Sequence, residues 1–297
     1  MAVIVSWNPE IETIRATLTA VRDQRVDGAV VSDNDSRPEV KRELEVLGKE
    51  FPGFLHFSWN NGNLGMGGGL NRGVEKALAM GAEWVMTLEG DNTPEPGMIK
   101  KMMDAYAALP EEQKKIVATI APNYTSVRGG FAFPIGPAHI TEDGAITSGE
   151  IVKATTYKKV GMYNEDLFID YVDGEFCWRI ARNGMKTLLV SEAILKHRLG
   201  HPIRRKFFWR EAVIPNYPPY RYYYMARNSI YLYIRHFSTN ILQNKHWYRA
   251  VWALVIPRYI IKAIIFEDRK WEKIRMVLRG LGDGFCGKMG ILKNQQG

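Results

Sequence analysis

The N-terminal part of the chain alternates short apolar runs with amphipathic stretches, and this alternation restricts the fold more than any other feature. The apolar runs, which we expect to be strands, are residues 3–7, 29–32, 54–59, 84–88 and 116–120. Apolar residues recur between them at helical spacing, at Ile11, Ile14, Leu18 and Val21, at Val40, Leu44 and Leu47, and after a glycine-rich loop at Val74, Leu78 and Met80. Repeated strand–helix units predict an α/β fold with a mostly parallel sheet and helices on both faces.

The pattern changes after residue 144. We expect a loop, a helix near 153–160 and a second helix that begins around Asp173 and ends at Gly184. Short strands are expected at 188–191 and 193–196, and helices rich in Tyr, Arg and Trp follow Pro219. These boundaries predict one α/β domain at about 1–215, divided near residue 122 into two halves, and a helical, basic and aromatic C-terminal region at 216–297.

The size and composition favour a globular protein of a reducing compartment. With 297 residues, 46% of them hydrophobic, the chain can bury a large core. Its two cysteines, Cys177 and Cys286, lie far apart without a metal-binding spacing, so neither a disulfide framework nor a zinc site is indicated. The apolar N-terminus lacks a preceding basic region and favours a core strand over a signal peptide. We therefore expect a cytoplasmic protein.

The net charge of +8 is concentrated in the C-terminal third of the chain. Cations cluster at 196–210, and in 245–293 they alternate with aromatic and aliphatic residues, a mixture typical of segments that lie at a membrane interface. Arg249, Arg258 and Lys262 interrupt the apolar stretch that a spanning helix needs, and Pro257 would kink it. We expect peripheral contact with the inner face of the cytoplasmic membrane. No nucleic-acid-binding motif supports nucleic acid as a partner.

Polar residues follow four consecutive expected strands. They are Ser6 and Asn8 after the first strand, 33–36 after the second, 60–63 after the third and 89–92 after the fourth. Ligands of doubly wound sheets bind outside the carboxyl ends of the strands, so these residues should line one pocket. Asp33 could accept a hydrogen bond from N3–H of a pyrimidine, although Asp is also a common turn residue.

The glycine-rich stretch at 63–73 is read as a loop that lets the backbone approach a ligand. Asn63, Gly65 and Asn71 are its candidate binding residues. The stretch superficially resembles a dinucleotide-binding fingerprint, but it follows the third expected strand instead of the first, which argues against a dinucleotide site.

Two groups of acidic residues could carry chemistry. Glu89 and Asp91, two residues apart at the end of a strand, can bind a divalent cation, or they can belong to a solvated turn. Asp170, Asp173 and Glu175 lie at the start of a helix; one could cap that helix, and a partly desolvated Asp could serve as a general base.

Basic residues follow the second acidic group. His197 is a candidate metal ligand or a structural histidine. Arg204, Arg205 and Lys206 could neutralise a diphosphate or contact a lipid phosphate, or they could form a solvated basic loop.

In order, these segments resemble the family 2 glycosyltransferases of the GT-A fold, particularly the bacterial rhamnosyltransferase-like branch, over about residues 3–232. The matching segments are 33–36, the glycine-rich 63–73, 89–91, Thr147-Ser148-Gly149, 168–179, His197 with Gly200, and 222–228. The resemblance implies a cytoplasmic, inverting transferase that takes part in polysaccharide biosynthesis of the cell envelope.

The resemblance also implies individual roles. Asp33 would recognise the pyrimidine, Asp91 and His197 would bind Mn²⁺ or Mg²⁺ at the donor diphosphate, and Asp173 would be the catalytic base. The further nucleotide-sugar contacts are expected at Ser6, Asn8, Asn63, Gly65, Asn71 and Glu89, and the acceptor contacts at Ser148, Gly149, Asp170 and Glu175. Glu89 stands where relatives usually have Asp, and its longer side chain would shift the sugar or ribose contact.

The expected donor is dTDP-rhamnose, and the expected acceptor is a polysaccharide or a glycan linked to polyprenyl diphosphate. A galactofuranosyl- or other hexosyltransferase that uses a UDP-sugar is the alternative within the family. A nucleotidyltransferase, which would release pyrophosphate, and a basic nucleic-acid-binding protein are the alternatives outside it. A homo-oligomer is compatible with the sequence.

Overall fold

The computed structural model describes most of the chain and divides it into two compact units. Described are residues 1–125, 131–142, 146–196, 216–235 and 267–292, and only the backbone at 203–207, 210–214 and 236–237. The first unit is Met1–Glu165 with Phe176–Arg198, and the second is Asp166–Glu175 with Leu199–Gly297. The boundary that we expected at residue 215 thus differs from this division, which falls at residue 198 and counts 166–175 with the C-terminal unit.

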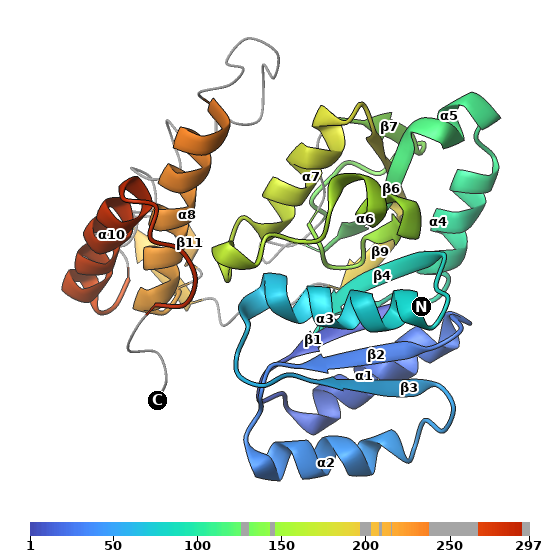
Figure 1. The fold of residues 1–297 in the computed structure, drawn as a ribbon, viewed down its shortest axis with the longest axis horizontal. Coiled ribbons are helices and arrows are strands. Elements are labelled where there is room, and N and C mark those ends of the chain that lie inside the picture. Colours follow the sequence, from blue (N-terminus) through green and yellow to red (C-terminus); the bar gives the residue numbers. More distant parts are fainter. Residues whose placement is uncertain are drawn as a thin grey trace. The chain divides into compact units, whose positions relative to one another are not determined.

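A nine-stranded mixed sheet forms the centre of the first unit (Figure 1). Its strands are β1 (Ala2–Ser6), β2 (Ala29–Asp33), β3 (Leu55–Trp59), β4 (Trp84–Glu89), β5 (Thr93–Pro94), β6 (Val117–Tyr124), β7 (His139–Thr141), β8 (Ile151–Lys153) and β9 (Lys186–Lys196). The order is β3-β2-β1-β4-β8-β6-β9-β5, with β7 paired to β9. The first four strands are parallel, as predicted, and β8 runs antiparallel between β4 and β6.

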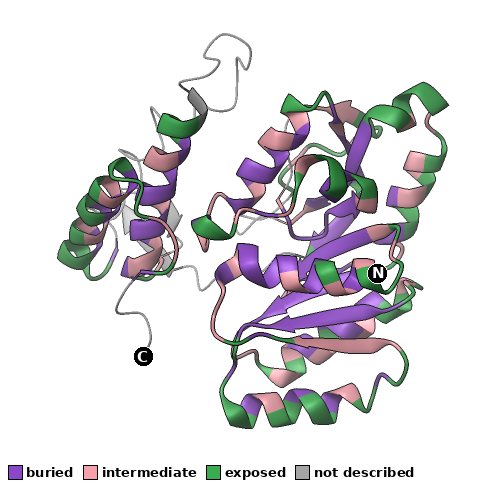
Figure 2. Ribbon diagram, viewed as in Figure 1, coloured by how far each residue is buried: buried purple, intermediate pink, exposed green. Residues whose placement is uncertain are grey.

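Helices cover both faces of the parallel part of this sheet. They are α1 (Ile11–Asp23), α2 (Pro38–Gly48), α3 (Gly65–Ala79), α4 (Met98–Ala107) and α5 (Glu111–Ile116). Ala2 and Ile4 of β1 join the core with α1 and α2, whereas Val3 and Val5 meet α3. Figure 2 shows β1 and β2 buried along their length. The alternation of side chains along one strand therefore builds two layers.

The expectation of a loop at 63–73 is wrong, because α3 already begins at Gly65 and contains most of the glycine-rich stretch. A Cβ at Gly67 would lie 2.8 Å from the Asn164 carbonyl oxygen, and one at Gly73 would lie 2.3 Å from Val3 Cγ1. Glycine lowers helix propensity by about 1 kcal/mol. Here its lack of a side chain lets α3 pack directly against its neighbours, which the local sequence does not reveal.

The later part of the first unit agrees with the sequence in its helices but not in its last strand. The helix α6 (Ala154–Val160) and the helix α7 (Val172–Arg182) lie where they were expected, with the 3₁₀ turn η1 (Glu165–Leu167) between them. The two short strands expected at 188–191 and 193–196 form one strand, β9. The register of β9 against β6 shifts between Pro122 and Asn123. This irregularity accommodates additional residues of β9 without ending the strand.

The described part of the second unit contains, besides the 166–175 segment, α8 (Pro219–Phe237), α10 (Lys270–Phe285) and a hairpin of β10 (Ile203–Phe207) and β11 (Arg210–Ile214). The helices expected after Pro219 are thereby confirmed. A Cβ at Gly280 would lie 2.4 Å from the Tyr223 carbonyl oxygen, and one at Gly284 would lie 2.5 Å from that of Arg227, so these glycines let α10 approach the backbone of α8. Within the part of the chain that is described, no helix has the length and apolar character to cross a membrane.

Candidate active site

The ends of β1 and β2 are joined by hydrogen bonds around the buried carboxylate of Asp33. Oδ1 of Asp33 accepts from the Ser6 hydroxyl at 3.3 Å and from the Ser36 hydroxyl at 2.5 Å, and Oδ2 accepts from the Ser36 backbone N–H at 2.9 Å. The Asn8 backbone N–H donates to the Ser36 hydroxyl at 2.7 Å, and Asn8 Oδ1 accepts from the Arg37 N–H at 2.9 Å. Ser6, Asn8 and Asp33, which the sequence assigned to one site, do lie together.

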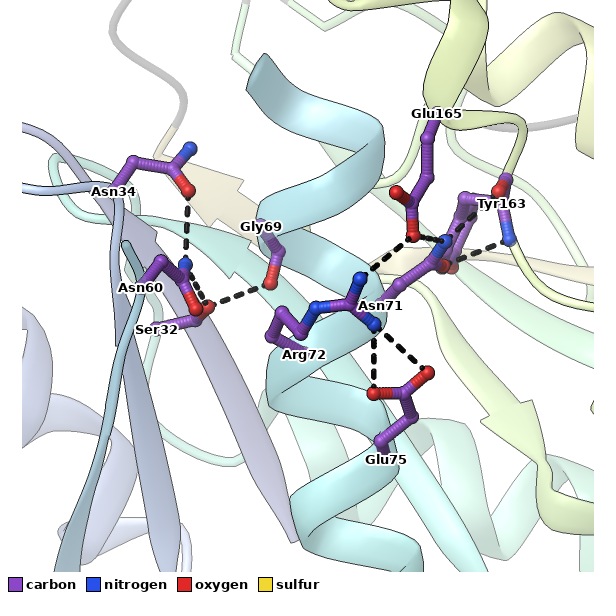
Figure 3. A network of polar contacts seen from close by, with 9 residues as sticks. All are labelled: Ser32, Asn34, Asn60, Gly69, Asn71, Arg72, Glu75, Tyr163 and Glu165. Atoms are coloured by element: carbon purple, nitrogen blue, oxygen red, sulfur yellow. Dashed lines mark hydrogen bonds and ion pairs between the residues drawn. The ribbon is translucent and has the colours of Figure 1, made fainter. Parts of the chain in front are cut away.

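A second set of contacts links the ends of β2 and β3 to the first turns of α3 (Figure 3). The Asn60 amide donates to the Ser32 hydroxyl at 3.1 Å and to Asn34 Oδ1 at 2.9 Å. Ser32 donates to the Gly69 carbonyl at 2.7 Å, and the Asn34 amide donates to the Gly65 carbonyl at 2.8 Å. Since all of these side chains are buried, the network fixes the edge of the sheet on which a ligand would bind.

The two asparagines predicted from the glycine-rich stretch support α3. Asn63 Oδ1 accepts from the Gly65 N–H at 2.9 Å, at the N-terminus of the helix. The Asn71 amide donates to the Tyr163 carbonyl at 2.9 Å and to Glu165 Oε1 at 2.8 Å, and its Oδ1 accepts from the Tyr163 N–H at 2.9 Å (Figure 3). These contacts anchor the segment before α7; contacts of Asn63 and Asn71 with a nucleotide-sugar stay predictions.

The end of β4 carries the acidic pair and contacts the segment that precedes β8. The Ser148 hydroxyl donates to Glu89 Oε1 at 3.2 Å and accepts from the buried Asn92 amide at 3.0 Å. Gly149, at a φ of 79°, donates its N–H to the Thr87 carbonyl at 2.6 Å. Ser148 therefore lies beside Glu89 at the end of β4, and its expected contact with the acceptor stays a prediction.

Asp91 lies half-buried in the turn between β4 and β5. Its chemistry fits Mg²⁺ or Mn²⁺, because such ions are commonly held by one or two carboxylates together with phosphate oxygens of the substrate. In the described ranges no three potential ligands lie close enough to hold an ion by themselves. The remaining expected ligand, His197, lies outside the described residues, as do the side chains of Arg204, Arg205 and Lys206 on β10.

Asp173 lies in the first turn of α7, where Oδ1 accepts from the Gly174 N–H at 2.8 Å. Burial raises the pKa of Asp173 against the lowering effect of that hydrogen bond; the charge of Asp170 raises it further and that of Arg221 lowers it. A carboxylate whose pKa is raised toward neutrality is a better proton acceptor for a hydroxyl than an ordinary one.

The two rival carboxylates have different surroundings. Asp170 accepts from Arg221 through both oxygens, at 2.5 and 3.2 Å, and Glu175 is buried, its N–H donating to the Tyr171 carbonyl at 3.0 Å. Their expected acceptor contacts stay predictions.

Sequence reasoning missed the buried amides of Asn34, Asn60 and Asn92, although it noted the polar strand ends in which they lie. Asn34 and Asn60 hold one another, and Asn92 holds Ser148, so none of them is an ordinary turn residue. An asparagine directly after an apolar strand is the signal that could have found Asn34 and Asn60.

The chain is similar to known proteins over most of its length. Residues 2–132 match the family model described as glycosyl transferase family 2. The chain is 28% identical, over 97% of its length and 96% of the relative, to the dTDP-rhamnosyl transferase RfbF of Shigella flexneri. It is 24% identical, over 90% of its length and 92% of the relative, to the galactofuranosyltransferase GlfT1 of Mycolicibacterium smegmatis.

A similar fold occurs among solved structures. The mannosyltransferase PcManGT from Pyrobaculum calidifontis, in complex with GDP-Man and Mn²⁺, has a TM-score of 0.57 and 13% sequence identity. The match covers 97% of this chain and 87% of that one. At this identity the comparison concerns the fold alone, and it extends over both compact units.

Proposed function

Because this chain is a family 2 glycosyltransferase, we propose that it transfers L-rhamnose from dTDP-rhamnose to a polysaccharide or lipid-linked glycan with inversion at the anomeric carbon. The observation that carries this proposal is the similarity to a dTDP-rhamnosyl transferase along 97% of the chain. The buried polar network at the ends of β1 to β4 supports a donor site at that edge of the sheet.

The pyrimidine of the donor would be recognised by Asp33. Its hydrogen bonds to Ser6 and Ser36 use three of the four lone-pair sites of the carboxylate, two on Oδ1 and one on Oδ2, so Oδ2 retains capacity for the N3–H of thymine. Since Asp33 is fully buried, thymine would reach its carboxylate only after a local movement of the residues that cover it.

Asp91 would hold Mn²⁺ or Mg²⁺ together with the donor diphosphate and His197. The ion would supply positive charge to the departing nucleoside diphosphate. Glu89, oriented by Ser148, would contact the sugar or ribose, and Arg204, Arg205 and Lys206 would add positive charge for the diphosphate.

Asp173 would act as the general base. It takes the proton of the acceptor hydroxyl as that oxygen bonds to the anomeric carbon, and the bond from this carbon to the diphosphate breaks on the opposite face. The proton therefore ends on Asp173, and the configuration is inverted. The pKa of Asp173, raised by burial and by Asp170, suits this role because the carboxylate binds a proton more readily than an ordinary Asp.

The test of the donor is a thermal-shift screen of nucleoside diphosphates and their sugars, with and without Mn²⁺, followed by product analysis. We expect dTDP-rhamnose with Mn²⁺ to stabilise the protein most; a ligand at 100 times its Kd adds about 2.7 kcal/mol. A preference for UDP-galactofuranose would instead support a galactofuranosyltransferase, the second candidate, for which the similarity to GlfT1 speaks. Pyrophosphate release from a nucleoside triphosphate, or no response to any nucleotide-sugar, would overturn the proposal.

We also propose that the second unit contacts the inner face of the cytoplasmic membrane, where a polyprenyl-diphosphate-linked acceptor would reside. Trp271, Leu278 and Phe285 are 81%, 64% and 75% exposed and recur every seven residues along α10, so they form one apolar line on its surface. Arg275 and Arg279 are exposed on the same helix. Such a combination favours an anionic membrane surface.

A further inference from the structure

The loop before Asp173 has an unfavourable backbone conformation. Phe168, Asp170 and Tyr171 have φ values of 63°, 63° and 68°, in the left-handed region. For residues with a side chain this region costs about 1–2 kcal/mol each. Three such residues within four positions need contacts that hold them in place.

The side chain of Asn228 in α8 supplies part of this support. Its amide nitrogen donates to the carbonyl oxygens of Leu167 at 2.9 Å, Ile169 at 2.8 Å and Asp170 at 2.9 Å. Asn228 is fully buried. One side chain therefore contacts three carbonyl oxygens of the loop, which share its two amide hydrogens.

Other residues of α8 hold the same loop. Arg227, also fully buried, donates to the carbonyl oxygens of Asp166 at 3.0 Å and Leu167 at 2.9 Å. Arg221 donates to both carboxylate oxygens of Asp170, and the ring of Tyr224 stacks on Phe168 with centroids 5.0 Å apart. Most of the contacts of this loop thus come from a helix more than fifty residues away in the sequence.

The loop continues directly into the helix that carries Asp173. The Tyr171 carbonyl accepts the Glu175 N–H at 3.0 Å, and Asp173 lies within the turn that this bond closes. A change in the backbone at Asp170 or Tyr171 would therefore move or rotate the carboxylate of Asp173.

We propose that Asn228 and Arg221 are positioning residues for the proton transfer, because they fix the 166–171 loop from which Asp173 projects. This inference rests on the proposed function, in which Asp173 is the base. In the proposed mechanism neither residue contacts a substrate. Their effect passes through the loop backbone and, for Arg221, through the charge next to Asp173.

The first experiment replaces Asn228 with Asp, which has the same shape but presents a second oxygen to the three carbonyls. We expect kcat to fall by roughly 10- to 100-fold with little change in the KM for the donor, since a misplacement of about 1 Å can cost that much. The matched control is Ser229→Ala, which removes a hydrogen bond to the Ala226 carbonyl within α8 and leaves the loop untouched. Tyr222→Phe, which removes a hydrogen bond to Glu267, is a second control for lowered stability in this unit.

The second experiment uses Arg221, whose side chain is 29% exposed, less buried than that of Asn228. The charged groups that act on Asp173 are Asp170 on the loop and Arg221 on α8. Arg221→Gln removes the charge that lowers the pKa of Asp173 and leaves Asp170 uncompensated, so the acidic limb of the kcat/KM profile should move to higher pH. Arg221→Lys should restore most of that shift but less of kcat, because lysine lacks the fork that grips both oxygens.

The outcomes separate this inference from the proposed function. If Asp173→Asn retains the turnover of the unmodified protein, the assignment of the base is wrong, and with it the inference. If Asp173→Asn is inactive but Asn228→Asp keeps a kcat within twofold of Ser229→Ala, and Arg221→Gln leaves the acidic limb in place, the base stands and the positioning roles fall. Should Asn228→Asp fail to fold, the pH profile of Arg221→Gln decides alone.

Discussion

Replacing Gly69 with Ala should show that the glycines of α3 couple the fold to the donor site. The added Cβ would lie 2.8 Å from both Asn34 Nδ2 and Val5 Cγ1, closer than packed atoms tolerate. Asn34 would have to move, which breaks its bonds to Asn60 and the Gly65 carbonyl. Overpacking costs about 1–3 kcal/mol and each lost hydrogen bond about 1 kcal/mol, against a gain of about 1 kcal/mol in helix propensity. With two hydrogen bonds lost, the expected net loss of stability is about 2–4 kcal/mol.

The matched control is Gly282→Ala on α10, where a Cβ would meet no atom within 4 Å. Without a clash, only the propensity gain remains, and stability should rise by up to about 1 kcal/mol. Urea unfolding and donor binding would be measured for both variants. Gly69→Ala should unfold at lower urea concentration and bind the donor more weakly, and Gly282→Ala should do neither. If the two variants unfold and bind the donor alike, the close packing of α3 is not what holds the sheet edge.

Four further predictions concern the proposed site and the membrane. Asp91→Asn should abolish transfer and weaken metal-dependent donor binding in calorimetry; unchanged turnover with the same metal requirement would refute the role of Asp91. Asp173→Asn should preserve folding and donor binding while the transfer rate falls by roughly 10²- to 10⁴-fold. Since burial raises the pKa of Asp173, the activity of the unmodified protein should decline, as the pH is lowered, at a higher pH than for an ordinary carboxylate; a pH–rate profile without that acidic limb would contradict this. Replacing Trp271, Leu278 and Phe285 with Ser should release the protein from sedimenting anionic vesicles at low salt, and equal recovery of both proteins in the supernatant would exclude docking through α10.

The sequence predicted the parallel half of the fold because periodicity is a local property. Strand and helix faces around Ile14, Leu18 and Leu44 could be read from spacing alone, and the structure buries all three residues. The glycine-rich stretch was misread because its helical glycines pack against Val3 and Asn164, which are distant in the sequence. Local propensity favoured a loop there, and tertiary packing overrode it.

The candidate site was predictable in position but not in its contacts. That Ser6, Asn8 and Asp33 would lie together follows from two adjacent parallel strands ending at one edge. The hydrogen bond of Ser148 to Glu89 joins residues 59 positions apart, and the ion pair of Asp170 with Arg221 joins residues 51 positions apart. Contacts over such separations follow no periodic pattern in the sequence. The roles of these residues could therefore be assigned only through a resemblance.

The placement of β8 has a consequence for the order in which the nascent chain can fold. β8 spans residues Ile151–Lys153, yet it lies in the sheet between β4 and β6, which precede it in the sequence. While the ribosome has released only the residues that match the family model, β4 and β6 have no strand to join them, and their edges offer free backbone groups to other chains. The two halves of the sheet can close only once β8 has emerged. Until residues 151–153 have emerged, the nascent chain therefore carries strand edges that favour aggregation.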